Sequence, residues 1–284
     1  MLSKVVVFHH PQSEGAAAFA RRAAGELARQ GADVEVGDVW SPAAQSWLEG
    51  AELALVVGGD GSVLRAARLT VGLGTPLLGV NMGRLGFLTD ISPELCLSLM
   101  DRILAKDWRI EPRIMVHAEL LDPDGQRQGT FDGLNDIVVS RQSPGRPVYV
   151  ELRIDGARLA TYRCDGMIVA TPTGSTGYSL SAGGPILAPT EHHLVVTPVS
   201  AHLALGRSVV LGPESSVELR VTSDHGAVLS VDGQEDVPMG SGARVVVRVS
   251  EHVAHFVRFR EPSSFYGELA DKLDVQLSSP TLHA

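Results

Sequence analysis

Five consecutive apolar residues, 53–57 (LALVV), run directly into the sequence Gly58-Gly59-Asp60-Gly61-Ser62. A strand that is apolar on both faces is typical of the interior of a parallel sheet. The glycines and a helical pattern over residues 62–69 then predict a strand–turn–helix unit, whose backbone amides face a phosphate at the positive end of the helix. Ser62 is predicted to cap this helix. The alternative is a plain tight turn with a capping Asp.

This unit belongs to a longer alternation of strand and helix signals in the first third of the chain. Apolar strands alternate with segments of helical spacing. Gly31 marks the end of one predicted helix and Pro93 the start of another. Such a rhythm predicts an α/β domain with an open, mostly parallel sheet, over residues 1–112. The predicted strands are 4–8, 34–36, 53–57 and 76–80, and the predicted helices are 14–29, 62–69 and 93–106.

The pattern changes near Pro112 to short alternating strands with Gly or Asp at the turns. Residues 114–141 and 149–171 each resemble a hairpin, the second with its turn at Asp155-Gly156. We therefore expect a mostly antiparallel β domain over residues 113–255. A tail, residues 256–284 with a helix over 265–273, is expected to pack back on the first domain.

Charge and composition exclude several classes. The net charge of −9 argues against a nucleic-acid partner, since such footprints need concentrated positive charge. No apolar run approaches the roughly 20 residues needed to cross a bilayer, and no secretory signal opens the chain, so we expect a cytoplasmic protein without a membrane partner. Cys96 and Cys164 have no partner at ligand spacing, which predicts free buried thiols and no metal site.

Asp60 is the unusual member of the glycine turn, because a simple anion cradle would avoid negative charge. It fits a site in which a carboxylate accepts the proton of a hydroxyl nucleophile or helps hold Mg²⁺ beside phosphates. The chain lacks G-x-x-x-x-G-K-[ST], G-x-G-x-x-G and G-x-S-x-G. These absences disfavour a P-loop NTPase, a conventional Rossmann dehydrogenase and an α/β-hydrolase.

Two further motifs follow predicted strands. Residues 81–90 (NMGRLGFLTD) come after the strand 76–80, where open α/β sheets line their ligand crevice. Residues 165–185 (DGMIVATPTGSTGYSLSAGGP) combine hydroxyls and glycines with almost no charge, a composition suited to sugar hydroxyls and phosphate oxygens. Tyr178 offers an aromatic face to a base. A flexible Gly/Ser linker is the alternative, and the interleaved apolar residues fit it poorly.

Taken in order, GGDGS, NMGRLGFLTD, LNDIVV, DGMIVATPTGSTGYSLSAGGP and VTPVSAHLALGRSVV resemble the motif series of the NAD kinases, over about residues 53–234. The long run from Asp165 is highly specific, whereas GGDG also occurs in lipid kinases and phosphofructokinases. The resemblance implies transfer of the γ-phosphoryl group of ATP to the 2′-hydroxyl of the adenosine ribose of NAD, giving NADP. It also implies Mg²⁺ with ATP, polyphosphate as an alternative donor, and a homodimer or homotetramer.

The resemblance assigns roles residue by residue. Asp60 matches the catalytic carboxylate, and the turn around it would hold the phosphates of ATP. Asn135 and Asp136 match an Asn-Glu pair that binds the acceptor nucleotide, with Asp one methylene shorter than Glu. Gly177 stands where the family often has Ala. The remaining matches are residues expected near the phosphates or the acceptor nucleotide: Gly58, Gly59, Gly61, Ser62, Asp165, Thr176, Tyr178, Ser181 and Gln234.

Two alternatives stay open. A lipid or sugar kinase would share only the GGDG element and would not need the run over residues 165–185. A non-catalytic NAD-binding sensor would keep the fold and bind the nucleotide as an effector, although the retention of Asp60 argues for an enzyme.

Overall fold

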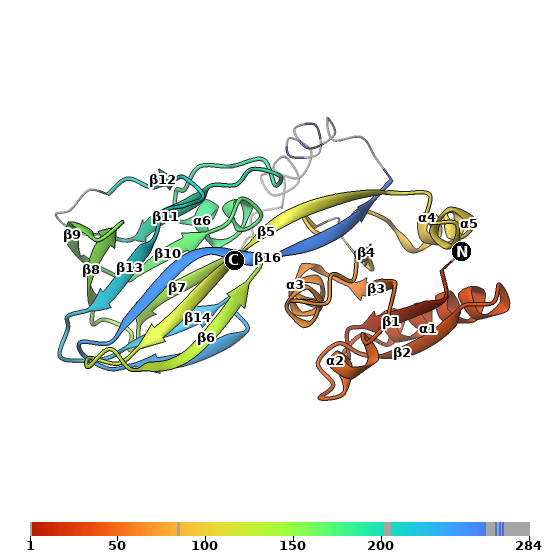
Figure 1. Ribbon diagram of the computed structural model, residues 1–284, viewed down its shortest axis with the longest axis horizontal. Coiled ribbons are helices and arrows are strands. Elements are labelled where there is room, and N and C mark those ends of the chain that lie inside the picture. The colour runs from red at the N-terminus through yellow and green to blue at the C-terminus, as the bar shows by residue number, and fades with distance from the viewer. Residues whose placement is uncertain are drawn as a thin grey trace, which may run out of the picture. The chain divides into compact units, whose positions relative to one another are not determined.

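The computed structural model describes residues 2–83, 86–201 and 206–259, together with Phe265, Gly267 and Leu269 (Figure 1). The chain divides into two compact units. One contains the residues up to Glu111 and those from His255 onward, and the other is Pro112–Ala254. The rest of the expected tail and the loop around His202 lie outside the described residues. None of the helices in the described ranges combines the length and the apolar character needed to cross a membrane.

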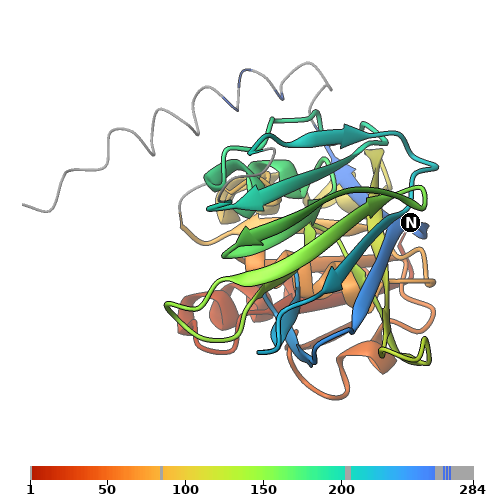
Figure 2. The same cartoon turned by 90° about the vertical axis from the view of Figure 1, so that its left-hand side faces the viewer.

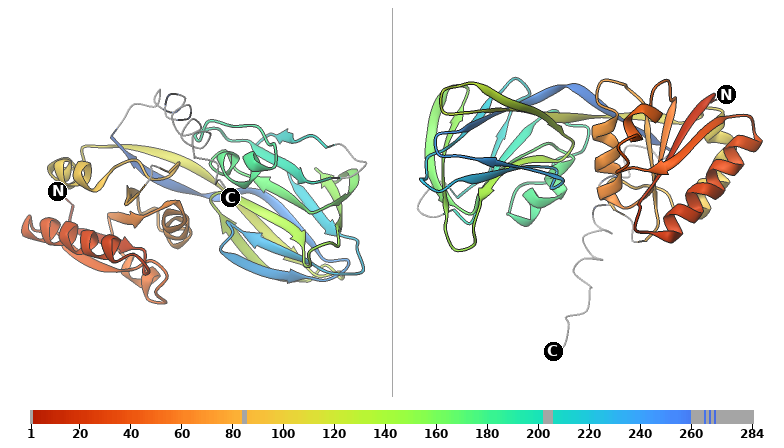
Figure 3. Two further views of the ribbon diagram at one scale, coloured as in Figure 1. Left: turned by 180° about the vertical axis from the view of Figure 1, so that it is seen from behind. Right: turned by 90° about the horizontal axis from the view of Figure 1, so that it is seen from below.

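The first unit is an α/β unit built on a parallel sheet, whose strand order is β2-β1-β3-β4-β16. Helix α1 packs on one face and α3 on the other, as the right-hand view of Figure 3 shows. Its elements are β1 (Lys4–His9), α1 (Glu14–Arg29), β2 (Asp33–Asp38), α2 (Ala44–Trp47), β3 (Leu53–Gly58), α3 (Asp60–Leu69), β4 (Leu77–Asn81), α4 (Pro93–Ser98) and α5 (Met100–Leu104), joined by the end of β16 (Arg244–Arg258).

Local sequence explains the first of these helices. The Ser13 side chain caps α1 by accepting a hydrogen bond from the Ala16 amide at 3.2 Å. The buried residues of α1, including Phe19, Ala23 and Leu27, recur with helical spacing and pack on the sheet. Strand β3 is buried along its whole length, as expected for the interior of a parallel sheet.

The second unit, shown in Figure 2, is a β-sandwich of mostly antiparallel strands. One sheet contains β16-β13-β8-β9 with β5 and β6, and the other is β12-β11-β10-β7-β14-β15; their inner faces share one apolar core. Its elements are β5 (Arg109–Leu121, which begins in the first unit), β6 (Arg127–Gly133), β7 (Asp136–Arg141), β8 (Val148–Ile154), β9 (Ala157–Cys164), β10 (Gly166–Ala170), the 3₁₀ helix η1 (Gly174–Thr176), α6 (Tyr178–Ser181), β11 (Leu194–Val199), β12 (Val209–Leu211), β13 (Val217–Val221), β14 (Ala227–Val231), β15 (Glu235–Met239) and the first part of β16.

The predicted fold class, an α/β unit and a mostly antiparallel β unit, is confirmed. The turn between β8 and β9 is also where the sequence predicts it, because Asp155 and Gly156 adopt φ angles of 51° and 79° that suit a two-residue hairpin loop. Both free cysteines are buried, as expected.

Three local predictions are wrong. Helix α3 begins at Asp60 rather than at Ser62, and the helix expected over residues 93–106 is split into α4 and α5 at Leu99. The two predicted hairpins also end early. β5 pairs with β6 and β8 with β9, but the following strands β7 and β10 cross into the other sheet and pair with each other.

Candidate functional site

The glycine turn after β3 places Asp60 at the first position of α3. Gly59 is the N-cap residue, in an extended conformation with no side chain to cap the helix. Gly59 and Gly61 are exposed, and a Cβ added to either would meet no atom of the described residues within 4 Å. A ligand could therefore approach the backbone closely at the positive end of α3.

The Asp60 carboxylate is held by the segment that follows β4. Its Oδ2 accepts a hydrogen bond from the Phe87 amide at 2.8 Å, and its Oδ1 accepts one from the Leu88 amide at 3.1 Å. The Thr89 hydroxyl donates to Oδ1 at 3.4 Å. Three donors from one short segment thus fix the orientation of a partly exposed carboxylate.

Two glycines allow this close approach. A Cβ at Gly86 would lie 2.0 Å from Oδ1 of Asp60. A Cβ at Gly79, on β4, would lie 3.1 Å from the Leu88 carbonyl oxygen and 3.2 Å from Thr89. Both positions therefore need glycine for the segment to pack between β4 and Asp60.

Ser62 does not cap α3, which corrects the prediction from sequence. Its side chain lies inside the first turn, 1% exposed, and no partner for its Oγ occurs among the described residues. A Cβ at Gly58 would approach this Oγ to 2.5 Å, so Gly58 and Ser62 form a buried contact. The exposed part of the turn is therefore Gly59 to Gly61.

In the second unit, a carboxylate organises the connection between β6 and β7. Asp232 accepts hydrogen bonds from three successive amides: those of Leu134 at 2.8 Å, Asn135 at 2.7 Å and Asp136 at 3.0 Å. Its own amide donates to the Asp136 carbonyl at 3.0 Å. The resemblance places Gln234, in this turn, near the phosphates or the acceptor nucleotide, but it assigns no role to Asp232. Asp232 is thus a functional candidate that sequence reasoning missed.

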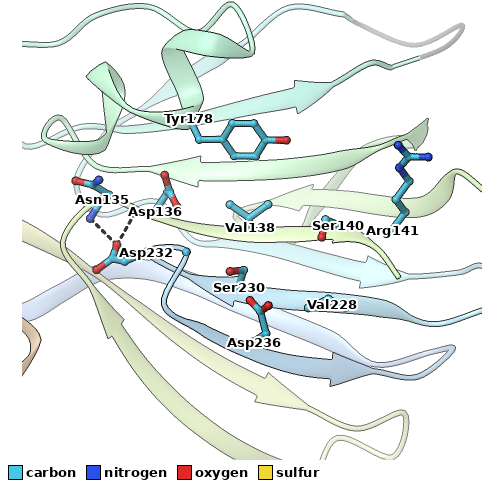
Figure 4. A pocket seen from close by; sticks show the side chains of 11 residues that line it. Asn135, Asp136, Val138, Ser140, Arg141, Tyr178, Val228, Ser230, Asp232 and Asp236 are labelled. Atoms are coloured by element: carbon cyan, nitrogen blue, oxygen red, sulfur yellow. Dashed lines mark hydrogen bonds between the residues drawn. The ribbon is translucent and has the colours of Figure 1, made fainter. Parts of the chain in front are cut away.

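A pocket of about 600 Å³ opens beside this connection (Figure 4). Asn135 and Asp136 lie with Asp232 at one end of it, and Arg141 lies at the other. Its floor consists of cross-strand neighbours of β7 and β14, Val138 facing Ser230 and Ser140 facing Val228. The lining residues are Asn135, Asp136, Val138, Ser140, Arg141, Tyr178, Val228, Ser230, Asp232, Gly233 and Asp236.

The pocket combines groups that suit a nucleoside. Its three carboxylates and two serine hydroxyls can bind sugar hydroxyls, and the half-exposed ring of Tyr178 can cover a base. The pocket has three carboxyl groups and one arginine, and this excess of acidic groups makes it a poor site for phosphate groups.

Burial raises the pKa of Asp136 to about 7, with a second contribution from the negative charge of Asp232. The ordinary value is 3.8. Between these values the folded chain holds a proton that the unfolded chain releases, so the free energy of unfolding falls as the pH rises. The full effect amounts to about 4 kcal/mol at 1.36 kcal/mol per pKa unit.

We therefore predict that Asp136→Asn removes this pH dependence. The difference in unfolding free energy between wild type and variant should change progressively from about pH 4 to about pH 7 and stay constant above it, measured by urea unfolding. A difference that stays the same over this range would contradict the raised pKa.

The other residues predicted from sequence in the second unit do not line this pocket. Asp165 forms an ion pair with Arg141 at 3.1 Å. Thr176 ends η1, its hydroxyl donating to the Thr173 carbonyl at 3.1 Å, and a Cβ at Gly177 would lie 3.6 Å from Nδ2 of Asn135. Ser181 is exposed at the end of α6, and Gln234 lies in the β14–β15 turn.

Comparison with known proteins gives one family throughout. Residues 20–108 match the family model of the ATP-NAD kinase N-terminal domain, and residues 134–259 match that of the ATP-NAD kinase C-terminal domain. An NAD kinase from Dehalococcoides mccartyi strain CBDB1 is 36% identical over 274 residues, covering 96% of each chain. Another from Heliobacterium modesticaldum is 42% identical over 234 residues, covering 82% of each chain.

Solved structures show the same fold. The yeast NADH kinase complexed with NADH superposes with a TM-score of 0.83 at 22% identity, covering all of this chain and 90% of that one. The NAD kinase from Archaeoglobus fulgidus in complex with ATP gives a TM-score of 0.76 at 28% identity, covering 94% of this chain and 98% of that one.

Proposed function

The chain belongs to the ATP-NAD kinase family and is an ATP-dependent kinase that converts NAD to NADP, and we propose that Asp60 accepts the proton of the NAD hydroxyl that becomes phosphorylated. That hydroxyl is the 2′-hydroxyl of the adenosine ribose. The main observation behind this proposal is that the Phe87 and Leu88 amides fix the orientation of the Asp60 carboxylate.

Phosphoryl transfer depends mainly on positioning and electrostatic stabilisation. In the described part of the chain, Oδ2 of Asp60 accepts one hydrogen bond, which leaves a lone pair for a proton. As the ribose oxygen bonds to the γ-phosphorus, its proton passes to Asp60 and the bond from that phosphorus to the bridging oxygen of ADP breaks. The exposure of Gly59 and Gly61 at the N-terminus of α3 supports a role of this turn in holding ATP phosphates.

We place a nucleoside part of the acceptor, and not its diphosphate, against the residues of the 600 Å³ pocket. Asn135 and Asp136 would bind ribose hydroxyls, and Tyr178 would cover a ring. Asp165, through its ion pair with Arg141, would set the charge at the far end. The chemistry of these groups supports this assignment, since sugar hydroxyls donate readily to carboxylates.

Mg²⁺ is the cation proposed to accompany ATP. It prefers oxygen ligands and usually binds through one or two carboxylates together with substrate phosphates. Among the described residues, Asp60 lies beside the proposed phosphate site, but its Oδ1 already accepts two hydrogen bonds and its Oδ2 is assigned to the proton, so the phosphates of ATP would supply most of the ligands of the cation. When bound, the cation would neutralise part of the charge on the transferred phosphoryl group.

A glycine substitution tests the packing around Asp60. Gly86→Ala should lower turnover by about 10²-fold, because the new methyl group would displace the carboxylate and misplacement of about 1 Å has that effect. Gly83→Ala is the matched control, since a Cβ there would lie 4.0 Å from the nearest atom of the described residues, Oδ1 of Asn81. Steady-state rates of NADP formation distinguish them, and equal rates for the two variants would contradict the proposed role of Gly86.

An acceptor and donor panel tests the function against its alternatives. Wild-type protein is incubated with Mg²⁺, either ATP or polyphosphate, and NAD, NADH, a diacylglycerol or a hexose, and products are identified by mass spectrometry. We expect phosphorylated NAD. Phosphorylation of only the lipid or sugar would support the first alternative, and NAD binding without product would support a sensor.

We further propose that the chain forms a homodimer or homotetramer. This proposal rests on the resemblance to the family alone, and light scattering tests it.

A further inference from the structure

Arg258, at the end of β16, is a buried arginine in the first unit. Its Nη1 lies 2.7 Å from Oδ2 of Asp90 and its Nε lies 3.2 Å from Oε1 of Glu111. Arg109 lies 3.3 Å from the other oxygen of Glu111. We call these four residues the Arg258 cluster. It contains two positive and two negative charges, and Arg258 itself is only 5% exposed.

The Arg258 cluster is continuous with the segment that holds Asp60. Asp90 directly follows Phe87, Leu88 and Thr89, whose amides and hydroxyl donate to the Asp60 carboxylate. The backbone fixes the same end of the segment, because the Asn81 amide donates to the Ile91 carbonyl at 2.9 Å. Arg258 thus fixes the side chain at the end of the segment that orients Asp60.

Stability alone does not explain such an arrangement. Replacing buried ion pairs with apolar side chains is often neutral or stabilising, because taking the charges out of water costs as much as their attraction returns. What a buried guanidinium supplies is direction, since its planar donors bind carboxylates in fixed geometry. Here that direction is imposed on Asp90, one residue from Thr89.

We propose that Arg258 is a positioning residue for Asp60, acting through Asp90 and the segment 86–89. This inference rests on the proposed role of Asp60 in phosphoryl transfer. Loss of Arg258 would let the Phe87 and Leu88 amides move and would misalign the carboxylate, while the residues of the nucleotide pocket keep their places.

The test combines kinetics with a double-mutant cycle. Arg258→Met should lower kcat roughly 10- to 100-fold with nearly unchanged KM for NAD and ATP. Arg258→Lys, which keeps the charge, should retain more activity. In the Asp60→Asn background, Arg258→Met should lower kcat no further, because the two residues act as one unit. Arg158→Met, which removes an exposed arginine of the second unit paired with Glu151, is the control and should have wild-type kcat.

Two results would overturn the inference. One is wild-type kcat in Arg258→Met, and the other is a loss of kcat that multiplies with that of Asp60→Asn. Hydrogen exchange of the Phe87 and Leu88 amides gives a readout without activity, and it should be faster in Arg258→Met and Arg258→Lys than in wild type. Unchanged exchange would contradict the positioning role even if the wild-type protein made no NADP, whereas absent NADP alone would count only against the proposed function.

Discussion

Replacing Asp60 with asparagine should lower kcat for NADP formation by about 10²–10⁴-fold, the usual contribution of a general base. Asparagine has nearly the same size but cannot accept the proton of the ribose hydroxyl. Binding should be largely kept, so the KM for NAD and for ATP should change little. Initial rates at varied NAD and ATP measure both quantities.

Asparagine also offers one acceptor oxygen where aspartate offers two, so part of the loss could come from a shift of the Phe87 or Leu88 amide. Thr89→Val separates the two effects, because it removes one donor to Asp60 and leaves the carboxylate in place. We expect a smaller loss of kcat from Thr89→Val than from Asp60→Asn. Near-normal turnover in Asp60→Asn would contradict its assignment as the base.

Asp232→Ala should destabilise the second unit by several kcal/mol and weaken NAD binding. The substitution leaves the Leu134, Asn135 and Asp136 amides without their acceptor, and each unsatisfied buried donor costs about 1–3 kcal/mol. Such a loss is a large fraction of the free energy of unfolding of an ordinary domain. Urea unfolding measures the stability, and calorimetric titration with NAD measures the binding.

Two further variants make this prediction specific. Asp232→Asn should be intermediate, since asparagine tolerates the φ of 52° at this position and keeps one acceptor oxygen. Asp236→Ala removes an exposed carboxylate from the same pocket and should change stability by no more than about 0.5 kcal/mol. If Asp232→Ala were as stable as Asp236→Ala, the three hydrogen bonds would not be holding this connection.

Local patterns in the sequence were sufficient for much of the fold. The fully apolar run 53–57 predicts an interior parallel strand, and Asp155-Gly156 predicts a hairpin turn; the structure confirms both. These features depend on residues close together in the chain. The break at Leu99 has no such signal, because neither Gly nor Pro marks it.

The candidate site was harder to predict from the sequence because its contacts join residues that are far apart in the chain. Asp60 was evident from the glycine turn, but its donors lie 27 to 29 residues away. Asp232 accepts hydrogen bonds from amides 96 to 98 residues away, so no local pattern in the sequence indicates its role. The prediction for Ser62 is wrong for the opposite reason. Its residue type favours a cap, but the helix begins two residues earlier and buries it.

NADP formation by purified wild-type protein with NAD, ATP and Mg²⁺ is the most direct test of the kinase activity. An NADP-specific dehydrogenase reads the product, so only NAD phosphorylated to NADP gives a signal. We predict NADP formation that continues over many turnovers and depends on ATP. The absence of NADP from well-folded protein under these conditions would contradict the assignment of this chain as an NAD kinase.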